Sequence, residues 1–286
     1  MNPSVITAPF TLEYSRVLTI AGSDSGGGAG IQADLKTFSA LGCFGMCAVT
    51  ALTAQNTQGV RAIHAVPPEM LRQQIDAVVE DIGVHAVKVG MLHSAEVVAT
   101  VADAIDRHQL PRVVLDPVMV ATSGAVLIEQ PAVLALIAQL FGRVTLVTPN
   151  LDEAALLVGR PLVTQDDMER AASDLLAMGS HAVLVKGGHL AGDMVHDLLA
   201  TRAGLRHWMR GPRIASANTH GTGCTLSSAI AAHLALGADL RDAVESARAY
   251  VRGALEHGAA ARTGHGSGPL NHGFAPLAMR RVPLQN

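Results

Sequence analysis

Aromatic residues make up only 3% of the 286 residues, and charged residues make up only 16%. The chain has 21 basic and 24 acidic residues, for a net charge of -3, and no basic run is interleaved with aromatic residues. A nucleic-acid-binding surface is therefore not indicated. No stretch offers roughly 18 uninterrupted apolar residues, and the first residues lack a basic segment followed by an apolar one. We expect no nucleic-acid partner, no membrane span and no export signal.

Cysteine is also scarce, with Cys43, Cys47 and Cys224 the only three. Three cysteines cannot build a disulfide framework, which favours a reducing compartment, so we expect a cytoplasmic protein. Cys43 and Cys47 have no second Cys or His pair at metal-site spacing and are more simply interpreted as core residues than as zinc ligands. A Walker-type phosphate loop, G-x-x-x-x-G-K-[ST], is absent from the sequence.

What the chain does have is apolar material, because hydrophobic residues make up 49% of it. This amount suffices for a buried sheet with helices on both faces. The length is near the upper limit for a single core but is common for one α/β domain. We expect one domain over residues 1–286, with residues 1–15 as an N-terminal extension and with room for a small flap.

Apolar strands alternate with helical patterns along nearly the whole chain. Strands are predicted at 17–21, 45–53, 85–91, 111–119, 144–148 and 182–189, and a hairpin at 195–199 and 205–209. Helices are predicted at 31–41, 68–81, 94–108, 130–141, 165–179 and 239–257, with further helices starting at Asn150 and near Cys224. This alternation predicts a mostly parallel sheet, with the loops that follow the strands gathered at one edge.

Two early segments place polar residues at that edge. The first strand runs into a glycine loop that ends at Gly30, and Asp34 lies one turn into the next helix. Asp34 either faces the loop or simply favours the positive end of the helix. Residues 28–33 match the loose dinucleotide fingerprint G-x-G-x-x-A, but the acidic residue expected about 20 positions later is missing. Gln55 lies just past the predicted strand 45–53, where a ligand-binding residue or an ordinary solvated turn residue is expected.

Three later segments add charge to the same edge. Asp116 ends an apolar strand, and Lys186 ends another before two glycines, an arrangement suited to approaching phosphates. The residues Asn150-Leu-Asp-Glu153 follow a third strand. Their spacing is that of a helix capping box, which is a strong structural explanation by itself. A loop at 121–124 is predicted between the strand 111–119 and the helix 130–141.

The stretch from Asn218 to Ile230 is a glycine-bearing turn that runs directly into an apolar helix. Gly221 and Gly223 let successive N–H groups point outward, and the helix start adds unpaired N–H groups and a positive dipole end. Such a turn favours an anion, above all a phosphate, with Cys224 within reach of it. An ordinary helix with a buried cysteine is about equally compatible with this stretch alone. The convergence of Asp34, Gln55, Asp116, Lys186 and Cys224 on one edge favours an enzyme.

Seven motifs together resemble the bacterial hydroxymethylpyrimidine/phosphomethylpyrimidine kinases of thiamine biosynthesis. In chain order they are AGSDSGGGAGIQADLKT, ALTAQNTQGV, KVGML, LDPVM, TPNLDEA, VKGGH and HGTGCT. They keep the order of that family over roughly Val17 to Leu240, and the tail GHGSGPLNH resembles its closing segment. The resemblance implies a three-layer ribokinase-like α/β fold, with a central mostly parallel sheet between helices, no separate lid domain, and usually a homodimer.

The resemblance also implies a reaction. Such a kinase moves the γ-phosphoryl group of Mg-ATP to 4-amino-5-hydroxymethyl-2-methylpyrimidine and then phosphorylates the monophosphate. By resemblance, the pyrimidine pocket is lined by Gly22, Asp34, Gln55, Met91 and Val118. Asn150 and Glu153 would position Mg²⁺ through water, and Asp116 would support the metal or the loop. The nucleotide phosphates would meet Lys186 and the turn made by Gly221, Thr222, Gly223 and Cys224.

Cys224 departs from the wider sugar-kinase superfamily, in which an aspartate at this position acts as the base. A helix N-terminus lowers a thiol pKa, so we expect a thiolate near neutral pH that can take the proton of the hydroxymethyl group. The second phosphorylation needs no base, because its acceptor is already an ionised phosphate oxygen. Relatives with this cysteine include pyridoxal kinases, which makes pyridoxal kinase the alternative. A catalytically silent ligand-binding regulator is the alternative from another class, although the intact motifs argue against it.

Overall fold

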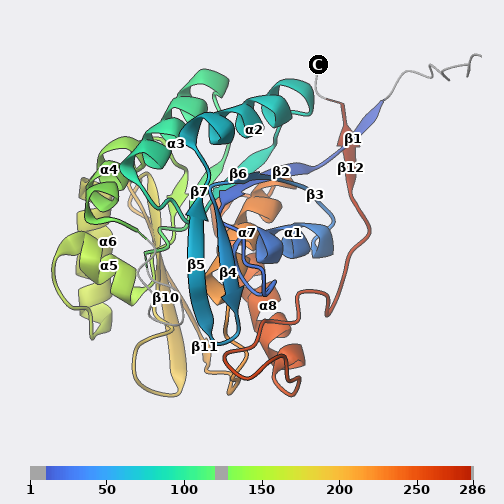
Figure 1. Cartoon of the computed structure of the whole chain (residues 1–286). Helices are drawn as coiled ribbons and strands as arrows, with labels where there is room; N and C mark the ends of the chain where they lie inside the picture. The colour runs from blue at the N-terminus through green and yellow to red at the C-terminus, as the bar shows by residue number, and fades with distance from the viewer. Residues whose placement is uncertain (1–10, 120–127, 285–286) are drawn as a thin grey trace, which may run out of the picture.

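The computed structural model of the chain describes residues 11–119 and 128–284, and within them eight strands form a central sheet (Figure 1). The strand order is β11-β10-β9-β8-β7-β6-β2-β3. The strands from β9 to β3 are parallel, and β9, β10 and β11 are joined antiparallel. In chain order they are β2 (Arg16–Ala21), β3 (Phe44–Val49), β6 (Ala86–Val89), β7 (Val113–Leu115), β8 (Leu146–Val147), β9 (Ala182–Lys186), β10 (Met194–Thr201) and β11 (Arg206–Pro212).

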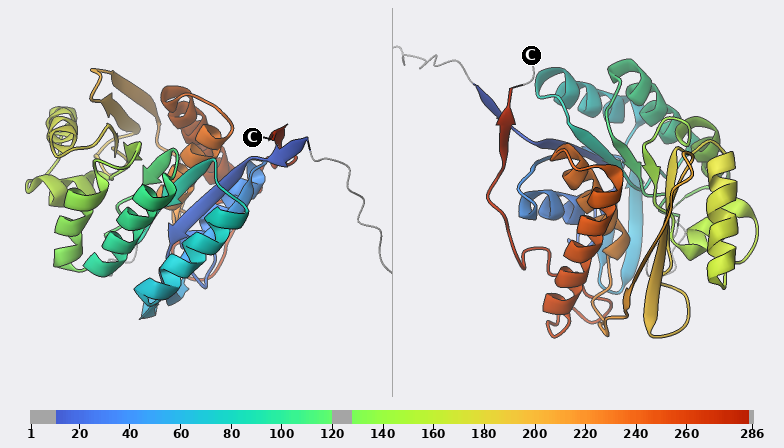
Figure 2. Two further views of the ribbon diagram at one scale, coloured as in Figure 1. Left: turned by 90° about the horizontal axis from the view of Figure 1, so that it is seen from above. Right: turned by 180° about the vertical axis from the view of Figure 1, so that it is seen from behind.

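Helices cover both faces of this sheet, which makes three layers (Figure 2). One face carries α2 (Pro68–Asp81), α3 (Ala95–His108), α4 (Gln130–Leu140), α5 (Leu151–Val158) and α6 (Gln165–Ala177). The other face carries α1 (Gly30–Ala40), α7 (Thr222–Ala235) and α8 (Leu240–Gly258). The predicted three-layer α/β fold is confirmed, and the hairpin and most predicted helices and strands lie close to their predicted bounds.

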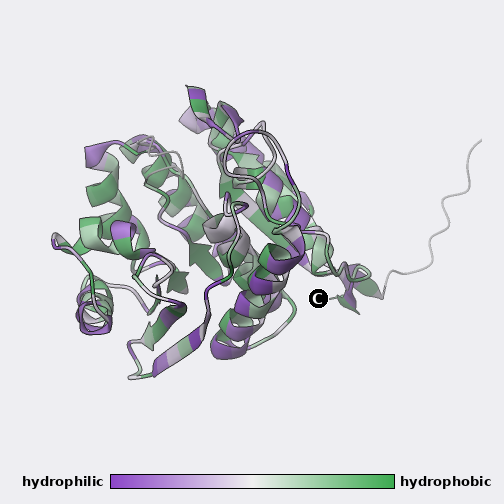
Figure 3. Ribbon diagram, turned by 90° about the horizontal axis from the view of Figure 1, so that it is seen from below, coloured by the Kyte–Doolittle hydropathy of each residue, from purple (hydrophilic) through white to green (hydrophobic). Residues whose placement is uncertain are grey.

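The alternation of side chains along a strand explains why there are two cores. In β2, Leu18 and Ile20 belong to the core shared with α2 and α3, whereas Val17 belongs to the core shared with α1 and α7. Successive side chains of a strand point to opposite faces, so a strand covered on both faces must be apolar throughout. Figure 3 accordingly shows the central strands predominantly coloured as hydrophobic. The sequence was therefore bound to show continuous apolar runs rather than alternation.

The predicted strand over residues 45–53 is wrong, because the chain leaves the sheet at Thr50. The Thr50 N–H donates to Ala21 O at 3.0 Å, and its hydroxyl donates to Met91 O at 2.8 Å. Beyond it, β4 (Ala51–Asn56) and β5 (Gly59–Ala65) form a separate antiparallel hairpin, which Figure 1 shows as an arm running away from the central sheet. Gln55 therefore lies inside a strand of this hairpin, not in a turn after a strand of the main sheet.

The ends of the described chain are joined to each other. Strand β1 (Leu12–Tyr14) pairs antiparallel with β12 (Arg281–Pro283), so part of the predicted N-terminal extension is a strand. The predicted loop at 121–124 lies outside the described residues. The stretch 264–272 packs against the hairpin and against the turn before α7, with the His220 N–H donating to Gly268 O at 3.1 Å. None of the described helices is long and apolar enough to cross a membrane.

Candidate active site

A cavity of about 650 Å³ opens at the edge of the sheet where the parallel strands end. Strand ends, the hairpin, the glycine loop after β2 and the start of α7 all contribute to its walls. Every residue that the sequence analysis selected lines this cavity except Asp34. The lining residues include Gly22, Gln55, Met91, Asp116, Val118, Asn150, Glu153, Lys186, Gly221, Thr222, Gly223 and Cys224. Of the five residues predicted to converge at one edge, Gln55, Asp116, Lys186 and Cys224 lie together in this cavity wall and Asp34 does not.

The turn before α7 has the geometry expected of an anion site. Gly221 is the N-cap residue of the helix with φ 82°, and no side chain caps the first turn. A Cβ at Gly221 would overlap the carbonyl oxygen of Gly28, so both the backbone angle and the close packing require glycine there. The N–H groups of Gly223 and Cys224 precede the first i to i−4 hydrogen bond of the helix and are free to face an anion.

Lys186 brings a positive charge to this turn. Its Nζ lies 2.9 Å from Asp116 Oδ1 and 4.0 Å from Glu153 Oε2. A Cβ on Gly223 would lie 3.2 Å from the same ammonium, so the turn and the lysine are neighbours. Burial acts to lower the pKa of Lys186, but Asp116 and Glu153 raise it above its ordinary value. The lysine is therefore charged at neutral pH and faces the place where an anion would bind.

Asn150 and Glu153 form the capping box that their spacing predicts. The Glu153 N–H donates to Asn150 Oδ1 at 2.9 Å, and the Asn150 N–H donates to Glu153 Oε2 at 2.8 Å. Burial raises the pKa of Glu153 to about 7, with Asp116 adding to the shift and Lys186 opposing it. For Asp116, burial acts to raise the pKa, but Lys186 and Lys88 hold it below its ordinary value. Two buried carboxylates thus share the charge of Lys186.

Asp34 is the one predicted pocket residue that the structure moves out of the cavity. It is fully buried, and Lys88, also fully buried, donates to Asp34 Oδ2 at 2.9 Å and to Oδ1 at 3.1 Å. The hydroxyls of Thr19 and Ser228 each donate to the same carboxylate at 2.6 Å. The carboxylate is therefore occupied by protein partners and cannot line the pocket. Its partner Lys88 does reach the cavity wall.

Cys224 lies where the sequence places it, but the expected thiolate is wrong for the chain without ligands. Burial raises the pKa of Cys224 to about 11, and the opposing effect of the Lys88 ammonium is smaller. The sequence argument considered only the helix N-terminus. It missed that the thiol is desolvated and close to Asp34 and Asp116, whose negative charges also raise its pKa. The side chain is a protonated thiol at neutral pH.

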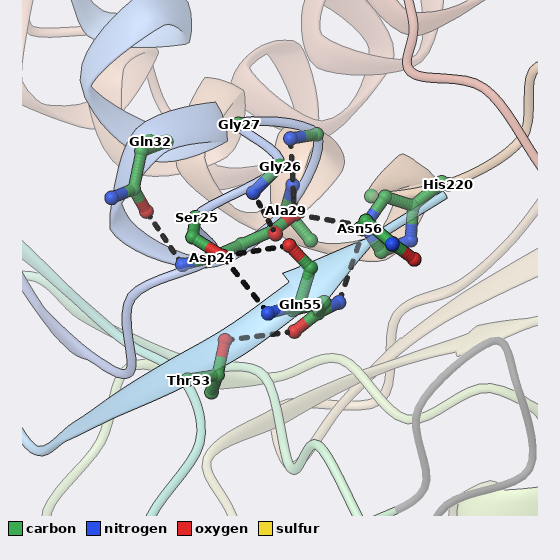
Figure 4. Close-up of polar contacts among 12 residues, drawn as sticks. Asp24, Ser25, Gly26, Gly27, Ala29, Gln32, Thr53, Gln55, Asn56 and His220 are labelled. Carbon is green, nitrogen blue, oxygen red and sulfur yellow. Dashed lines mark hydrogen bonds and ion pairs between the residues drawn. The ribbon is translucent and has the colours of Figure 1, made fainter. Parts of the chain in front are cut away.

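The hairpin contributes Gln55 to the cavity wall, which Met91 and Val118 also line. A Cβ on Gly22 would come within 2.5 Å of Met91 Cε, so the glycine makes room for the methionine. Sequence reasoning missed two residues here. His220 Nε2 lies 2.9 Å from Asp24 Oδ2 and 3.3 Å from the side-chain amide of Gln55 (Figure 4). The run S-D-S-G around Asp24 is a turn signal that could have identified one of them.

A third group of lining residues, beyond the anion turn, was also missed. Leu226, Val251 and Leu255 give this wall an apolar surface. Next to them, Arg248 Nε donates to Asp197 Oδ2 at 2.6 Å. No motif marks these residues, because ordinary helix faces supply the leucines and the valine. The cavity therefore has a polar end at the hairpin, a charged middle and a partly apolar end at α8.

Solved structures of kinases resemble this chain over most of its length. A phosphomethylpyrimidine kinase from Clostridium difficile 630 superposes with a TM-score of 0.74 at 41% sequence identity, over 83% of this chain and 97% of that one. An ADP complex of Bacillus subtilis pyridoxal kinase gives a TM-score of 0.83 at 35% identity, over 91% of this chain and 98% of that one. The fold and the site thus define a ribokinase-like small-molecule kinase.

The sequence comparison is narrower. The sequence model described as phosphomethylpyrimidine kinase matches residues 24–271. The hydroxymethylpyrimidine/phosphomethylpyrimidine kinase of Rhizobium meliloti (strain 1021) is 51% identical over 256 residues, which are 89% of this chain and 96% of that protein. The Escherichia coli (strain K12) protein of the same name is 46% identical over 89% of this chain and 96% of its own length. The chain belongs to the phosphomethylpyrimidine kinase family.

Proposed function

We propose that the chain transfers the γ-phosphoryl group of ATP to the hydroxymethyl group of 4-amino-5-hydroxymethyl-2-methylpyrimidine. A second transfer then converts the monophosphate to the diphosphate, in thiamine biosynthesis. The observation that carries the proposal is one cavity with a carboxamide, Gln55, at one end and a lysine beside a glycine turn, Lys186 and Gly221 to Cys224, in the middle. Membership of the family supports the same reaction.

At the hairpin end, Gln55 would bind the edge of the pyrimidine. The 4-amino group and the adjacent ring nitrogen present a donor beside an acceptor, and a carboxamide presents the complement. Met91 and Val118 would contact the apolar part of the ring and its methyl group. These contacts would leave the hydroxymethyl group directed toward Cys224 and the anion turn.

In the middle of the cavity the chain would stabilise the transferring phosphoryl group. The N–H groups of Gly223 and Cys224 and the ammonium of Lys186 are fixed before any ligand binds, so no reorganisation is needed during the transfer. Phosphoryl transfer relies mainly on positioning and on stabilising charge. The same fixed groups would therefore serve both the hydroxyl acceptor and the phosphate acceptor.

Cys224 remains the candidate base for the first transfer. Its thiol is protonated in the chain alone, so the proton would have to leave the sulfur before or during the transfer. The nearby ammonium of Lys88 favours the thiolate, whereas burial and the carboxylates disfavour it. We infer that a base role would be specific to the first phosphorylation, because the second acceptor is already ionised.

Mg²⁺ fits the charges that surround Glu153. Two buried carboxylates share one lysine, and the raised pKa of Glu153, to about 7, shows that its negative charge is incompletely compensated. Mg²⁺ is typically bound by one or two carboxylates together with substrate phosphates and water. Glu153 and Asp116, with Asn150 orienting Glu153, would hold the ion through water. When bound, it would neutralise charge on the nucleotide phosphates.

Two further parts of the proposal concern the setting of the enzyme. We propose a homodimer, as the family resemblance implies, and the β4–β5 hairpin offers apolar contacts for it, with Leu52 51% exposed on one face and Ile63 42% exposed on the other. Sedimentation equilibrium would test this directly. The use of ATP, together with three free cysteines, supports a cytoplasmic enzyme.

Pyridoxal is the second candidate acceptor. A Staphylococcus aureus pyridoxal kinase in complex with AMP-PCP and pyridoxal has a TM-score of 0.83 and 32% identity over 95% of this chain. Cys224 lines the cavity, and its thiol would meet the aldehyde of a bound pyridoxal. A coupled assay of ATP consumption with the aminopyrimidine, its monophosphate and pyridoxal separates the two candidates. We expect the largest kcat/KM values for the two pyrimidines. A larger value for pyridoxal would reverse the assignment, and no consumption with any acceptor would favour a silent regulator.

A further inference from the structure

The orientation of the Gln55 carboxamide decides what the hairpin end of the cavity can bind. A carboxamide keeps its shape when its oxygen and nitrogen are exchanged, so the hydrogen-bond partners determine which end is which. As the atoms are placed, the amide nitrogen Nε2 lies 3.3 Å from His220 Nε2 and the oxygen Oε1 lies 3.2 Å from Thr53 Oγ1. Figure 4 shows the amide between these two groups. The hydrogen bonding of His220 and that of Thr53 each determine which end of the amide faces them.

The Asp24 carboxylate determines whether His220 Nε2 carries a proton. The Asp24 carboxylate is buried and accepts the N–H groups of Gly26 at 2.8 Å, Gly28 at 3.0 Å and Ala29 at 2.8 Å. Burial acts to raise its pKa, but the hydrogen bonds from His220 and from this backbone hold the pKa below its ordinary value. An ionised carboxylate only accepts hydrogen bonds. His220 Nε2, 2.9 Å from Asp24 Oδ2, must therefore carry a proton.

A protonated Nε2 cannot accept a hydrogen bond from an amide NH₂ group. Both the neutral tautomer with the proton on Nε2 and the doubly protonated ring present N–H at this atom. The third form, with Nε2 bare, would set a lone pair against the carboxylate of Asp24. The end of Gln55 that faces His220 is therefore its carbonyl oxygen, which shares the N–H with Asp24.

The hydroxyl proton of Thr53 determines which end of the Gln55 amide faces this residue. Thr53 Oγ1 donates to the carbonyl oxygen of Ser23 at 2.8 Å, and a hydroxyl has only one proton to give. Toward Gln55 it can only accept, so the end of the amide that faces Thr53 is the NH₂ group. Two neighbours on different parts of the chain thus require the same orientation, oxygen toward His220 and nitrogen toward Thr53. This orientation exchanges the amide oxygen and nitrogen relative to their placement in Figure 4.

We propose that Asp24, His220 and Thr53 are positioning residues that fix the Gln55 carboxamide in this one orientation and thereby set the acceptor specificity of the cavity. The inference deepens the proposed function and, for its substrate, rests on it. After these two contacts the amide keeps one N–H and one lone pair. The amide therefore selects a heterocycle with an acceptor next to a donor, such as a 4-aminopyrimidine. It disfavours the 4-oxo analogue, whose ring N–H and carbonyl reverse the pattern.

His220 also links Gln55, the residue proposed to bind the pyrimidine edge, to the anion turn. His220 directly precedes Gly221, and its N–H donates to Gly268 O at 3.1 Å. A Cβ on Gly28 would come within 2.5 Å of His220 Cδ2, so the imidazole is packed closely against the glycine loop. The imidazole is thus packed against the glycine loop, the main chain of His220 is held by Gly268, and Nε2 faces Gln55. This rigidity lets one histidine select between two orientations of an amide.

The proton on His220 can be tested without any substrate. Long-range ¹H–¹⁵N NMR of the histidine rings, with His220 assigned by comparison with His220→Gln, reports which ring nitrogen carries the proton. We expect Nε2 to be protonated in the wild type. A bare Nε2 with the proton on Nδ1 would overturn the proposal, whatever the enzyme phosphorylates.

The consequence for specificity is tested by binding, without turnover. Calorimetry gives the Kd values for 4-amino-5-hydroxymethyl-2-methylpyrimidine and for its 4-oxo analogue in the wild type, Thr53→Val and His220→Phe. We expect the preference for the amino compound to fall by about tenfold or more in both variants, because the amide can then rotate. His220→Gln, which keeps a donor toward Asp24, should restore part of the preference.

Thr37→Val is the control for Thr53→Val, because the hydroxyl of this buried threonine donates to Ala33 O at 2.7 Å within its own helix and does not line the cavity. It should leave the preference unchanged. Variants that weaken both compounds equally, with thermal midpoints like that of the control, would refute the positioning role. Wild-type protein that binds neither pyrimidine would instead refute the proposed substrate, and the NMR measurement would then decide the amide orientation alone.

Discussion

The middle of the cavity and its hairpin end are built from different kinds of interaction. In the middle, Lys186 lies between Asp116 and Glu153 beside a turn of open N–H groups. At the hairpin end, the uncharged carboxamide of Gln55 is held by Thr53 and His220. The charged groups stabilise the transferring phosphoryl group whichever acceptor is bound. A fixed hydrogen-bond donor and acceptor, in contrast, bind only a substrate with the complementary pattern of atoms. The difference suggests that the middle sets the rate of transfer and the hairpin end sets the choice of acceptor.

Lys186→Met should have the largest effect on the charged middle of the cavity. The loss of the ammonium should slow phosphoryl transfer by on the order of 10³-fold, because transition-state charge loses its fixed partner. Both acceptors should be affected alike, and the affinity for the aminopyrimidine should change little. Single-turnover rates with the pyrimidine and with its monophosphate measure this. A defect confined to one acceptor would contradict the division between the two regions.

Cys224→Ser asks whether the two phosphorylations differ in their need for a base. If the cysteine takes the hydroxyl proton, the first transfer should slow by at least about 10²-fold. The second should suffer far less, because its acceptor is ionised and the turn N–H groups remain. The two single-turnover rates of the variant give the answer. Equal slowing of both would leave the kinase assignment intact but remove the base role.

Asp34→Asn tests the reassignment of Asp34 from the pocket to the structural support beneath it. The substitution leaves the fully buried ammonium of Lys88 without its anion, which should cost about 3 to 5 kcal/mol of unfolding free energy. Chemical denaturation measures the loss. The control is Asp152→Asn, an exposed aspartate at the start of α5, which should change stability by well under about 1 kcal/mol. Unchanged stability of Asp34→Asn, with weakened pyrimidine binding, would return Asp34 to the pocket.

Gln55→Leu removes the hairpin-end contact while filling about the same space. The polar edge of the aminopyrimidine would lose its partners, so binding should weaken by about 1 to 3 kcal/mol. The rate at saturating pyrimidine should change much less, in contrast to Lys186→Met. Calorimetry for affinity, paired with single-turnover rates, separates the two effects. An unchanged Kd would exclude Gln55 as a substrate contact.

Glu153→Gln should change how the stability of the protein depends on pH. Burial raises the pKa of Glu153 from its ordinary value of 4.5 to about 7, so the folded chain holds a proton that the unfolded chain releases. Stability from this group is complete below the unfolded pKa and is lost as pH rises through the folded one. The wild type should therefore lose stability relative to Glu153→Gln between about pH 5 and about pH 7. Thermal midpoints of both proteins across this range report the difference.

The same variant should also weaken the dependence on Mg²⁺. Glutamine keeps a side-chain oxygen for the Asn150 N–H but carries no charge, so the apparent Mg²⁺ affinity should fall by on the order of tenfold. The Mg²⁺ concentration that gives half-maximal rate measures this. An unchanged value would make Glu153 a helix cap only.

Local signals in the sequence were enough to predict the layers and the charged part of the site. The continuous apolar runs identify strands buried on both faces, and the Asn150 to Glu153 capping box is complete within four residues. The glycines of the turn before α7 indicated outward N–H groups, and the left-handed angle of Gly221 is one that glycine adopts readily. These features depend on neighbours in the chain, so the sequence carries them directly.

The features that were missed or misplaced depend on partners far away in the chain. Asp34 meets Lys88 54 residues later, and His220 meets Asp24 across 196 residues. The raised pKa of Cys224 comes from burial among such groups, which a local helix-end argument does not include. The break at Thr50 depends on its hydrogen bonds to Ala21 and Met91, so periodicity alone joined two strands into one.

The most direct test of two successive transfers in one cavity is the product formed from one acceptor molecule. The purified chain is incubated with ATP, Mg²⁺ and 4-amino-5-hydroxymethyl-2-methylpyrimidine, and ³¹P NMR follows the phosphorus resonances over time. The account predicts a monophosphate ester that appears first and is then replaced by the coupled pair of doublets of a diphosphate. A monophosphate that accumulates without further reaction, or no pyrimidine phosphate at all, would contradict it.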